Sequence, residues 1–290
     1  VTRQGSEILI GGDFTRVGNV DANKIARWDG SSWHALGDGE QNGIGCCREV
    51  RAIFLDESDV YVGGNFFSAG GIDANNLARW DGTQWHSVGV GDENGVNQQV
   101  NALFKQGENL FVGGRFNRAG SIAADDIAIW DGAGWAGLGD SNHAGTDGEV
   151  FTIIGDGNRV FIGGTFSRVA STMANSVAAW DGTDWVAFGD GIQNFGFQGS
   201  VFDLEVRTES LYAVGRFDQA GSTEVSGIAV WNGTQWERIG TEPRDLLPDF
   251  LTIRSVAIDV SGAIYAGGNS NFTSAGTNSV NRVARWDSLR

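Results

Sequence analysis

The chain has little positive charge, little proline and almost no cysteine. Its 290 residues hold 20 lysines and arginines against 36 aspartates and glutamates, a formal net charge of −16. Such an acidic chain is not expected to bind nucleic acid or an anionic membrane through its general field. No run of about 18 apolar residues occurs, so no direct membrane insertion is expected. Against 2 prolines stand 45 glycines and 11 tryptophans, which favours many short strands joined by glycine turns.

Two motifs recur along the chain with a period of about 50 residues, which indicates one structural unit copied several times. The first motif is Gly-Gly-x-Phe, found at Gly11, Gly63, Gly113 and Gly163, with weaker copies at Val214 and Gly267. The second is Trp-Asp-Gly-x-x-Trp and its variants, which pair Trp28/Trp33, Trp80/Trp85, Trp130/Trp135, Trp180/Trp185 and Trp231/Trp236 and leave Trp286 alone.

One copy is expected to contain four strands. Residues 50–55 are apolar and β-branched, and a short polar turn leads to 60–62, a strand expected to stop at Gly63-Gly64. A third strand is expected at 77–80, followed by a two-residue Asp81-Gly82 turn and a fourth strand at 83–88. A four-stranded unit of this length is typical of a propeller blade.

These residues resemble the kelch repeat, in which a hydrophobic strand ends in Gly-Gly and an aliphatic-aromatic-Asp strand and a Trp follow. The pattern is most similar to that of secreted and cell-surface propellers, such as the fungal cortical-marker proteins and bacterial exported repeats. The resemblance covers nearly the whole chain. It implies an extracellular or cell-surface propeller, but it implies little about activity, because propellers carry many unrelated functions.

The predicted fold is therefore all-β: a single six-bladed β-propeller over 1–290 with four-stranded blades. The blades are expected near 1–49, 50–99, 100–149, 150–200, 201–252 and 253–290. Val1 aligns with Ile53, so the first inner strand is partial, and the chain ends before the outer strand of the last blade. Because an unpaired edge at the seam would be sticky, a strand from residues preceding Val1 is expected to close the ring.

Loop lengths suggest which face of the propeller binds a ligand. Links between strands one and two and between strands three and four are short. The loops after Gly-Gly-x-Phe, such as 68–75, and the blade-to-blade loops, such as 189–200, are long and should open on the opposite face, where binding residues concentrate. Predicted ligand-binding residues there are Phe195, Phe197, His143, Asp147 and Glu149. The two aromatic rings either pack over the blade tops or form a platform for a sugar ring or a protein partner.

Three further features leave alternatives open. Cys46 and Cys47 either form a vicinal disulfide or remain free thiols that bind a soft metal. No cofactor is predicted. Acidic loop residues such as Asp38, Asp92 and Asp140 could bind calcium, although no copy contains a complete calcium-binding motif. Asn232 and Asn271 begin sequons that matter only in a eukaryotic secretory setting.

The best enzymatic candidates are Asp203 and Glu205, which point to one side of the inner strand of blade five. Carboxylates so placed are about 7 Å apart, a separation that inverting glycoside hydrolysis can use. His34 and His86 follow outer-strand tryptophans and should lie at the rim, so no Ser-His-Asp set is predicted. The sequence thus favours a non-catalytic module that binds a glycan or protein partner on the loop-rich face. The alternative is a carbohydrate-active enzyme that uses Asp203 and Glu205.

Overall fold

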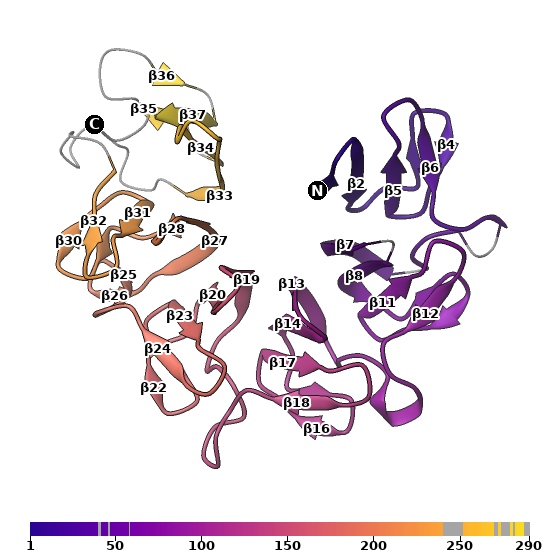
Figure 1. The fold of residues 1–290 in the computed structure, drawn as a ribbon, viewed down its shortest axis with the longest axis horizontal. Coiled ribbons are helices and arrows are strands. Elements are labelled where there is room, and N and C mark those ends of the chain that lie inside the picture. Colours follow the sequence, from indigo (N-terminus) through magenta and orange to yellow (C-terminus); the bar gives the residue numbers. More distant parts are fainter. Residues whose placement is uncertain are drawn as a thin grey trace. The chain divides into compact units, whose positions relative to one another are not determined.

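The computed structural model describes residues 1–39, 42–45, 47–57, 59–239, 252–269, 272–273, 279–280 and 282–286 (Figure 1). The chain divides into two compact units, Val1–Gly145 and Thr146–Arg290, and each is described by itself. Within the described residues, no helix is long and apolar enough to cross a membrane.

The first unit contains three antiparallel four-stranded sheets. The first sheet consists of β1 (Thr2–Gln4), β2 (Glu7–Gly11), β5 (Ile25–Trp28) and β6 (Trp33–Ala35). The second consists of β7 (Cys47–Asp56), β8 (Asp59–Phe66), β11 (Leu77–Trp80) and β12 (Trp85–Ser87). The third consists of β13 (Gln99–Gln106), β14 (Asn109–Arg115), β17 (Ile127–Trp130) and β18 (Trp135–Gly137).

The second unit repeats the same strand order. Its first sheet consists of β19 (Val150–Gly155), β20 (Val160–Gly164), β23 (Val177–Trp180) and β24 (Trp185–Ala187). Its second consists of β27 (Ser200–Arg207), β28 (Ser210–Arg216), β31 (Ile228–Trp231) and β32 (Trp236–Glu237). Its third has three strands among the described residues, β33 (Ile253–Ile258), β34 (Ile264–Gly268) and β37 (Val283–Trp286).

The prediction of an all-β chain of repeated four-stranded antiparallel sheets is confirmed. The first inner strand is short, as expected: Thr2 pairs with Leu9 in β1, as Phe54 pairs with Tyr61 in β7, which places Val1 at the position of Ile53. The repeats thus form a propeller-like architecture. The closed ring of six blades and the single domain over 1–290 stay predictions.

The segments after Gly-Gly-x-Phe were expected to be loops. In the structure they form pairs of two-residue strands. They pair β3 (Arg16–Val17) with β4 (Val20–Asp21), β9 (Ser68–Ala69) with β10 (Ile72–Asp73), β15 (Arg118–Ala119) with β16 (Ile122–Ala123), β21 (Arg168–Val169) with β22 (Thr172–Met173), β29 (Gln219–Ala220) with β30 (Thr223–Glu224), and β35 (Phe272–Thr273) with β36 (Ser279–Val280). Strands of this length carry too little periodicity to be seen in the sequence.

The second strand of the blade does not stop at the glycine pair. It continues through it, so that β8 includes both Gly63 and Gly64. A Cβ atom on Gly63 would collide with the side chain of Val100 in the next sheet, and one on Gly64 would collide with the backbone oxygen of Glu49. Gly63 therefore permits close approach of the next sheet, Gly64 permits close approach of β7 in its own sheet, and neither glycine ends the strand.

The core of each unit lies between neighbouring sheets. Leu9 and Ile25 of the first sheet are buried in one cluster with Val50, Val62 and Phe66 of the second. The second and third sheets share another cluster, and two more clusters join the sheets of the second unit. Each interface is thus built from apolar residues that lie about 50 residues apart in the chain.

The paired tryptophans lie directly opposite each other on the third and fourth strands. Trp130 pairs with Trp135, with ring centroids 5.4 Å apart, and the other pairs are similar. The fourth-strand ring is buried in four of the five pairs, for example Trp135 at 8% exposed, whereas Trp33 and the third-strand rings such as Trp130 are partly buried. The fourth-strand indole also makes a hydrogen bond to the loop between β12 and β13, because Trp135 Nε1 donates to the Glu93 backbone oxygen at 2.8 Å.

The turn between these tryptophans has four residues, not the two expected, because Asp131 to Gly134 lie between the paired rings. An aspartate organises it. Asp131 Oδ1 accepts hydrogen bonds from the backbone N–H groups of Ala133 and Gly134, both at 2.8 Å. Asp29, Asp81 and Asp181 act in the same way, and Asn232 replaces them in the fifth copy.

Candidate functional site

Asp203 lies on β27, the first strand of its sheet, and its carboxylate is held by neighbouring strands. Oδ2 accepts the backbone N–H of Val256 in β33 at 3.0 Å, and Oδ1 accepts that of Leu204 at 3.0 Å. The hydroxyl of Thr152 in β19 lies 3.5 Å from Oδ1. The three strands belong to three successive sheets of the second unit, so the carboxylate links them together.

The electrostatics of this position favour protonation of both acids. Burial raises the pKa of Asp203, although the N–H groups of Val256 and Leu204 oppose that shift. Burial and then repulsion from Asp203 raise the pKa of Glu205. Raised carboxyl pKa values suit a general acid, but both oxygens of Asp203 already accept backbone hydrogen bonds. Of the two acids, Glu205 is therefore better suited to proton transfer.

An aromatic and cationic stack, which sequence reasoning missed, lies on the same inner strands. The rings of Phe151 and Phe202 have centroids 5.3 Å apart, and the Arg254 guanidinium lies 4.2 Å from the Phe202 centroid. In the strand pairings, these residues sit at β-bulges of β19, β27 and β33. Aligning the inner strands of the repeats would have placed the three at one position, but not in contact.

The predicted aromatic residues Phe195 and Phe197 are exposed, at 51% and 79%. The sequence placed both residues in an irregular loop. In the structure they lie at the tip of a hairpin formed by β25 (Ile192–Asn194) and β26 (Phe197–Gln198). This hairpin extends the β29–β30 hairpin into a four-stranded sheet. The Phe195 backbone N–H donates to Asp218 Oδ1 at 2.8 Å, so the tip is anchored as well as exposed.

The three predicted polar residues belong to different units. His143 lies in the first unit, in a turn where Asp140 Oδ1 accepts its backbone N–H at 2.9 Å. Asp147 and Glu149 lie in the second. Asp147 accepts the backbone N–H groups of Ser167 and Arg168 at 2.7 and 3.0 Å. Burial tends to raise the pKa of Asp147, but hydrogen bonds from Ser167 and Arg168 outweigh it and lower the value. Asp147 therefore braces a hairpin.

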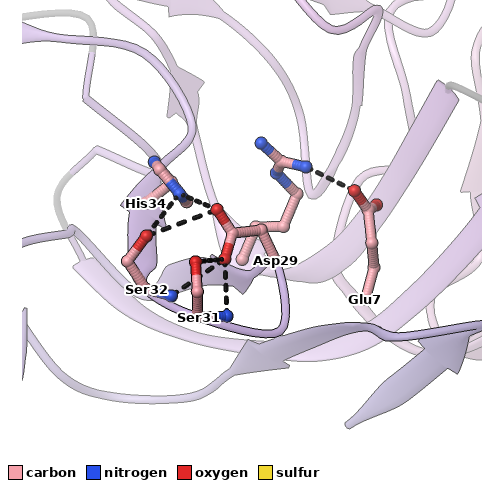
Figure 2. Close-up of polar contacts among 6 residues, drawn as sticks. Glu7, Asp29, Ser31, Ser32 and His34 are labelled. Atoms are coloured by element: carbon pink, nitrogen blue, oxygen red, sulfur yellow. Dashed lines mark hydrogen bonds and ion pairs between the residues drawn. The ribbon is translucent and has the colours of Figure 1, made fainter.

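His34 and His86 close turns rather than form a catalytic set. His34 Nε2 lies 2.7 Å from Asp29 Oδ2 and 3.1 Å from Ser32 Oγ (Figure 2). A relay needs the acid and the serine on different ring nitrogens, whereas here both lie near Nε2. His86 repeats the 2.7 Å contact with Asp81. Glu7, also drawn, pairs with Arg27 at 2.5 Å.

Several further predictions are not tested by the structure. Cys46 lies outside the described residues, of Cys47 only the backbone is described, and Asn271 lies outside them as well. Asn232 caps its turn. Among the described residues, no group of three or more His, Cys, Asp or Glu side chains could hold a metal ion, and calcium binding stays a prediction.

Comparison with known proteins supports the fold alone. No protein-family model and no curated protein matches the chain. The crystal structure of the computationally designed Ika8 protein is similar over 91% of this chain, with a TM-score of 0.50 and 16% identity. The chain spans 64% of the length of that designed protein. Fold and likeness together define a propeller-like repeat protein.

Proposed function

We propose that the protein is a six-bladed propeller of kelch-like repeats that acts as a non-catalytic recognition module outside the cell or at its surface. Its partner is a glycan or a protein, bound on the side of the hairpins and blade-to-blade loops. One observation supports this proposal most: Phe195 and Phe197 are exposed on an anchored hairpin. Rigid exposed aromatic residues are typical of binding surfaces, because little conformational entropy is lost on contact.

A glycan array read in parallel with a glycoside-hydrolysis screen tests this proposal. Replacing Phe195 and Phe197 together by Ala should weaken binding of any ligand found by about thirtyfold, because each of the two rings contributes on the order of 1 kcal/mol. Asp181→Asn, in a turn between the third and fourth strands, is the matched control and should leave affinity unchanged. Loss of affinity in the control but not in the double variant would show that the opposite side binds.

The second candidate function is glycoside hydrolysis. It rests on the raised pKa values of Asp203 and Glu205. Any hydrolysis found in the screen should disappear in Glu205→Gln, while the double phenylalanine variant should retain it. Turnover that survives Glu205→Gln would rule out this pair as the catalytic acids.

A further inference from the structure

A hollow of about 460 Å³ opens in the first unit beside the second sheet. Its walls come from the β9–β10 hairpin, the end of β12 and the loop that leads to β13. They include Phe67, Asp73, Asn75, Ser87, Val90 and Asn94. Phe67 is 55% exposed and Val90 79% exposed, so two large apolar side chains face solvent around one cavity.

Three of these residues, Phe67, Ser87 and Val90, are found only in the second of the first four repeats. The position of Phe67 is polar in the other copies, namely Thr15, Asn117, Ser167 and, in the fifth copy, Asp218. The position of Val90 carries Asp38, Asp140 and Asp190. The position of Ser87 carries Ala35, Gly137 and Ala187. Since those copies form the same sheet with other residues, the fold does not require this combination.

The walls are held in place by hydrogen bonds that do not involve the side chains of Phe67, Ser87 and Val90. Asn75 Nδ2 donates to the Asn94 backbone oxygen at 3.0 Å, and Asn94 Nδ2 donates to the Asp73 backbone oxygen at 3.1 Å. Asn23, Asn42 and Asp21 form the same lock in the first repeat. On its far side the loop is held by the Trp135 indole at Glu93. The asparagine side chains thus hold the hairpin and the loop together, and the cavity is formed before any ligand binds.

We propose that this hollow binds one neutral pyranose ring of a saccharide. The exposed face of Phe67 stacks on the C–H face of the sugar, and Val90 covers its edge. The Asp73 carboxylate and the Ser87 hydroxyl bond the sugar hydroxyls, which act as both donors and acceptors. The volume lies within the usual range of small-molecule sites.

The charges and rings around the hollow disfavour other small ligands. An anion would meet the Asp73 carboxylate in the wall, in a chain of net charge −16. A quaternary ammonium ion is usually enclosed by several aromatic faces, whereas Phe67 is the one aromatic residue in the wall. The hollow is built from a hairpin and a blade-to-blade loop, the elements proposed above for recognition, but it uses no residue of the Phe195–Phe197 hairpin, so binding at each can be tested without the other.

The test is an NMR titration of the full chain carrying ¹³C-labelled valine methyl groups. The probes are methyl glucopyranoside, methyl mannopyranoside and methyl galactopyranoside. At least one of these probes should shift the Val90 methyl signals in a saturable way. Phe67→Thr, which installs the residue of the first repeat, should weaken that binding by about two- to tenfold. Ser87→Ala should weaken it about tenfold or less, through one lost hydrogen bond.

Phe197→Ala is the control and should leave the Val90 titration unchanged. Near-UV circular dichroism of the tryptophans should be the same in every variant, because the first repeat folds with Thr15 and Ala35 in the equivalent positions. The proposal is wrong if no pyranoside shifts Val90, if Phe67→Thr binds as well as the native chain, or if tetramethylammonium binds more tightly than every pyranoside.

Discussion

Asp131 shows how one exposed carboxylate stabilises a turn. Hydrogen bonds from the Gly134 and then the Ala133 backbone N–H groups lower its pKa below 3.8. A carboxyl group whose pKa is lower in the folded chain stabilises that chain above the unfolded pKa, and this contribution disappears as pH falls through the folded value. Asn accepts the same two bonds without charge, as Asn232 does in the fifth copy.

Asp131→Asn should therefore be less stable than the native chain at pH 7, and the difference should disappear as pH falls through the lowered pKa of Asp131 in the folded chain. Urea unfolding at a series of pH values measures it. The control is Asp184→Asn, which removes one charge from a similar turn but leaves the carboxylate cap at Asp181 in place. A stability difference for Asp131→Asn that stays constant from pH 7 to pH 2 would mean that the pKa shift does not stabilise the turn.

The second strand of three repeats depends on a glycine, Gly11, Gly63 or Gly163, for close contact with the next sheet. Gly63→Ala should lower the free energy of unfolding by about 1–3 kcal/mol, because the new methyl group overlaps the Val100 side chain in a packed interface. Gly134→Ala is the matched control, since an added Cβ there meets nothing within 4 Å. Denaturant melts of both variants should show a loss for Gly63→Ala alone, and equal effects would argue against sheet-to-sheet packing as the cause.

Taken over the whole molecule, like charges dominate, with 36 acidic against 20 basic residues. Salt weakens such repulsion between exposed groups, while exposed ion pairs such as Arg16–Asp21 are worth little. Raising NaCl from about 0.05 to 0.5 M at pH 7 should therefore raise the melting temperature. The same change near pH 4.4, the calculated isoelectric point, should have a much smaller effect. A lower melting temperature at pH 7 in high salt would show that attractive pairs outweigh the repulsion.

The sequence by itself determined the repeat and most of its strands. Residues 77–80 were expected as a strand and form β11 (Leu77–Trp80), because an apolar strand bounded by turn residues is a local pattern. Such a strand depends only on neighbours in the chain, where side-chain period and turn chemistry act directly. The sequence left open whether Phe195 and Phe197 pack over the blade tops or form an exposed platform, and in the structure both are exposed.

Only the tertiary structure decided how the copies meet. The sequence placed Asp203 on an inner strand, but not under the N–H of Val256, 53 residues further on. The sequence indicated that a strand ends at Gly63, whereas the structure packs Gly63 against Val100 of the next sheet. It likewise contained Phe67, Ser87 and Val90 without showing that they surround one hollow. Each of these contacts crosses from one strand or loop to another that is distant in the chain, so no local pattern can encode it.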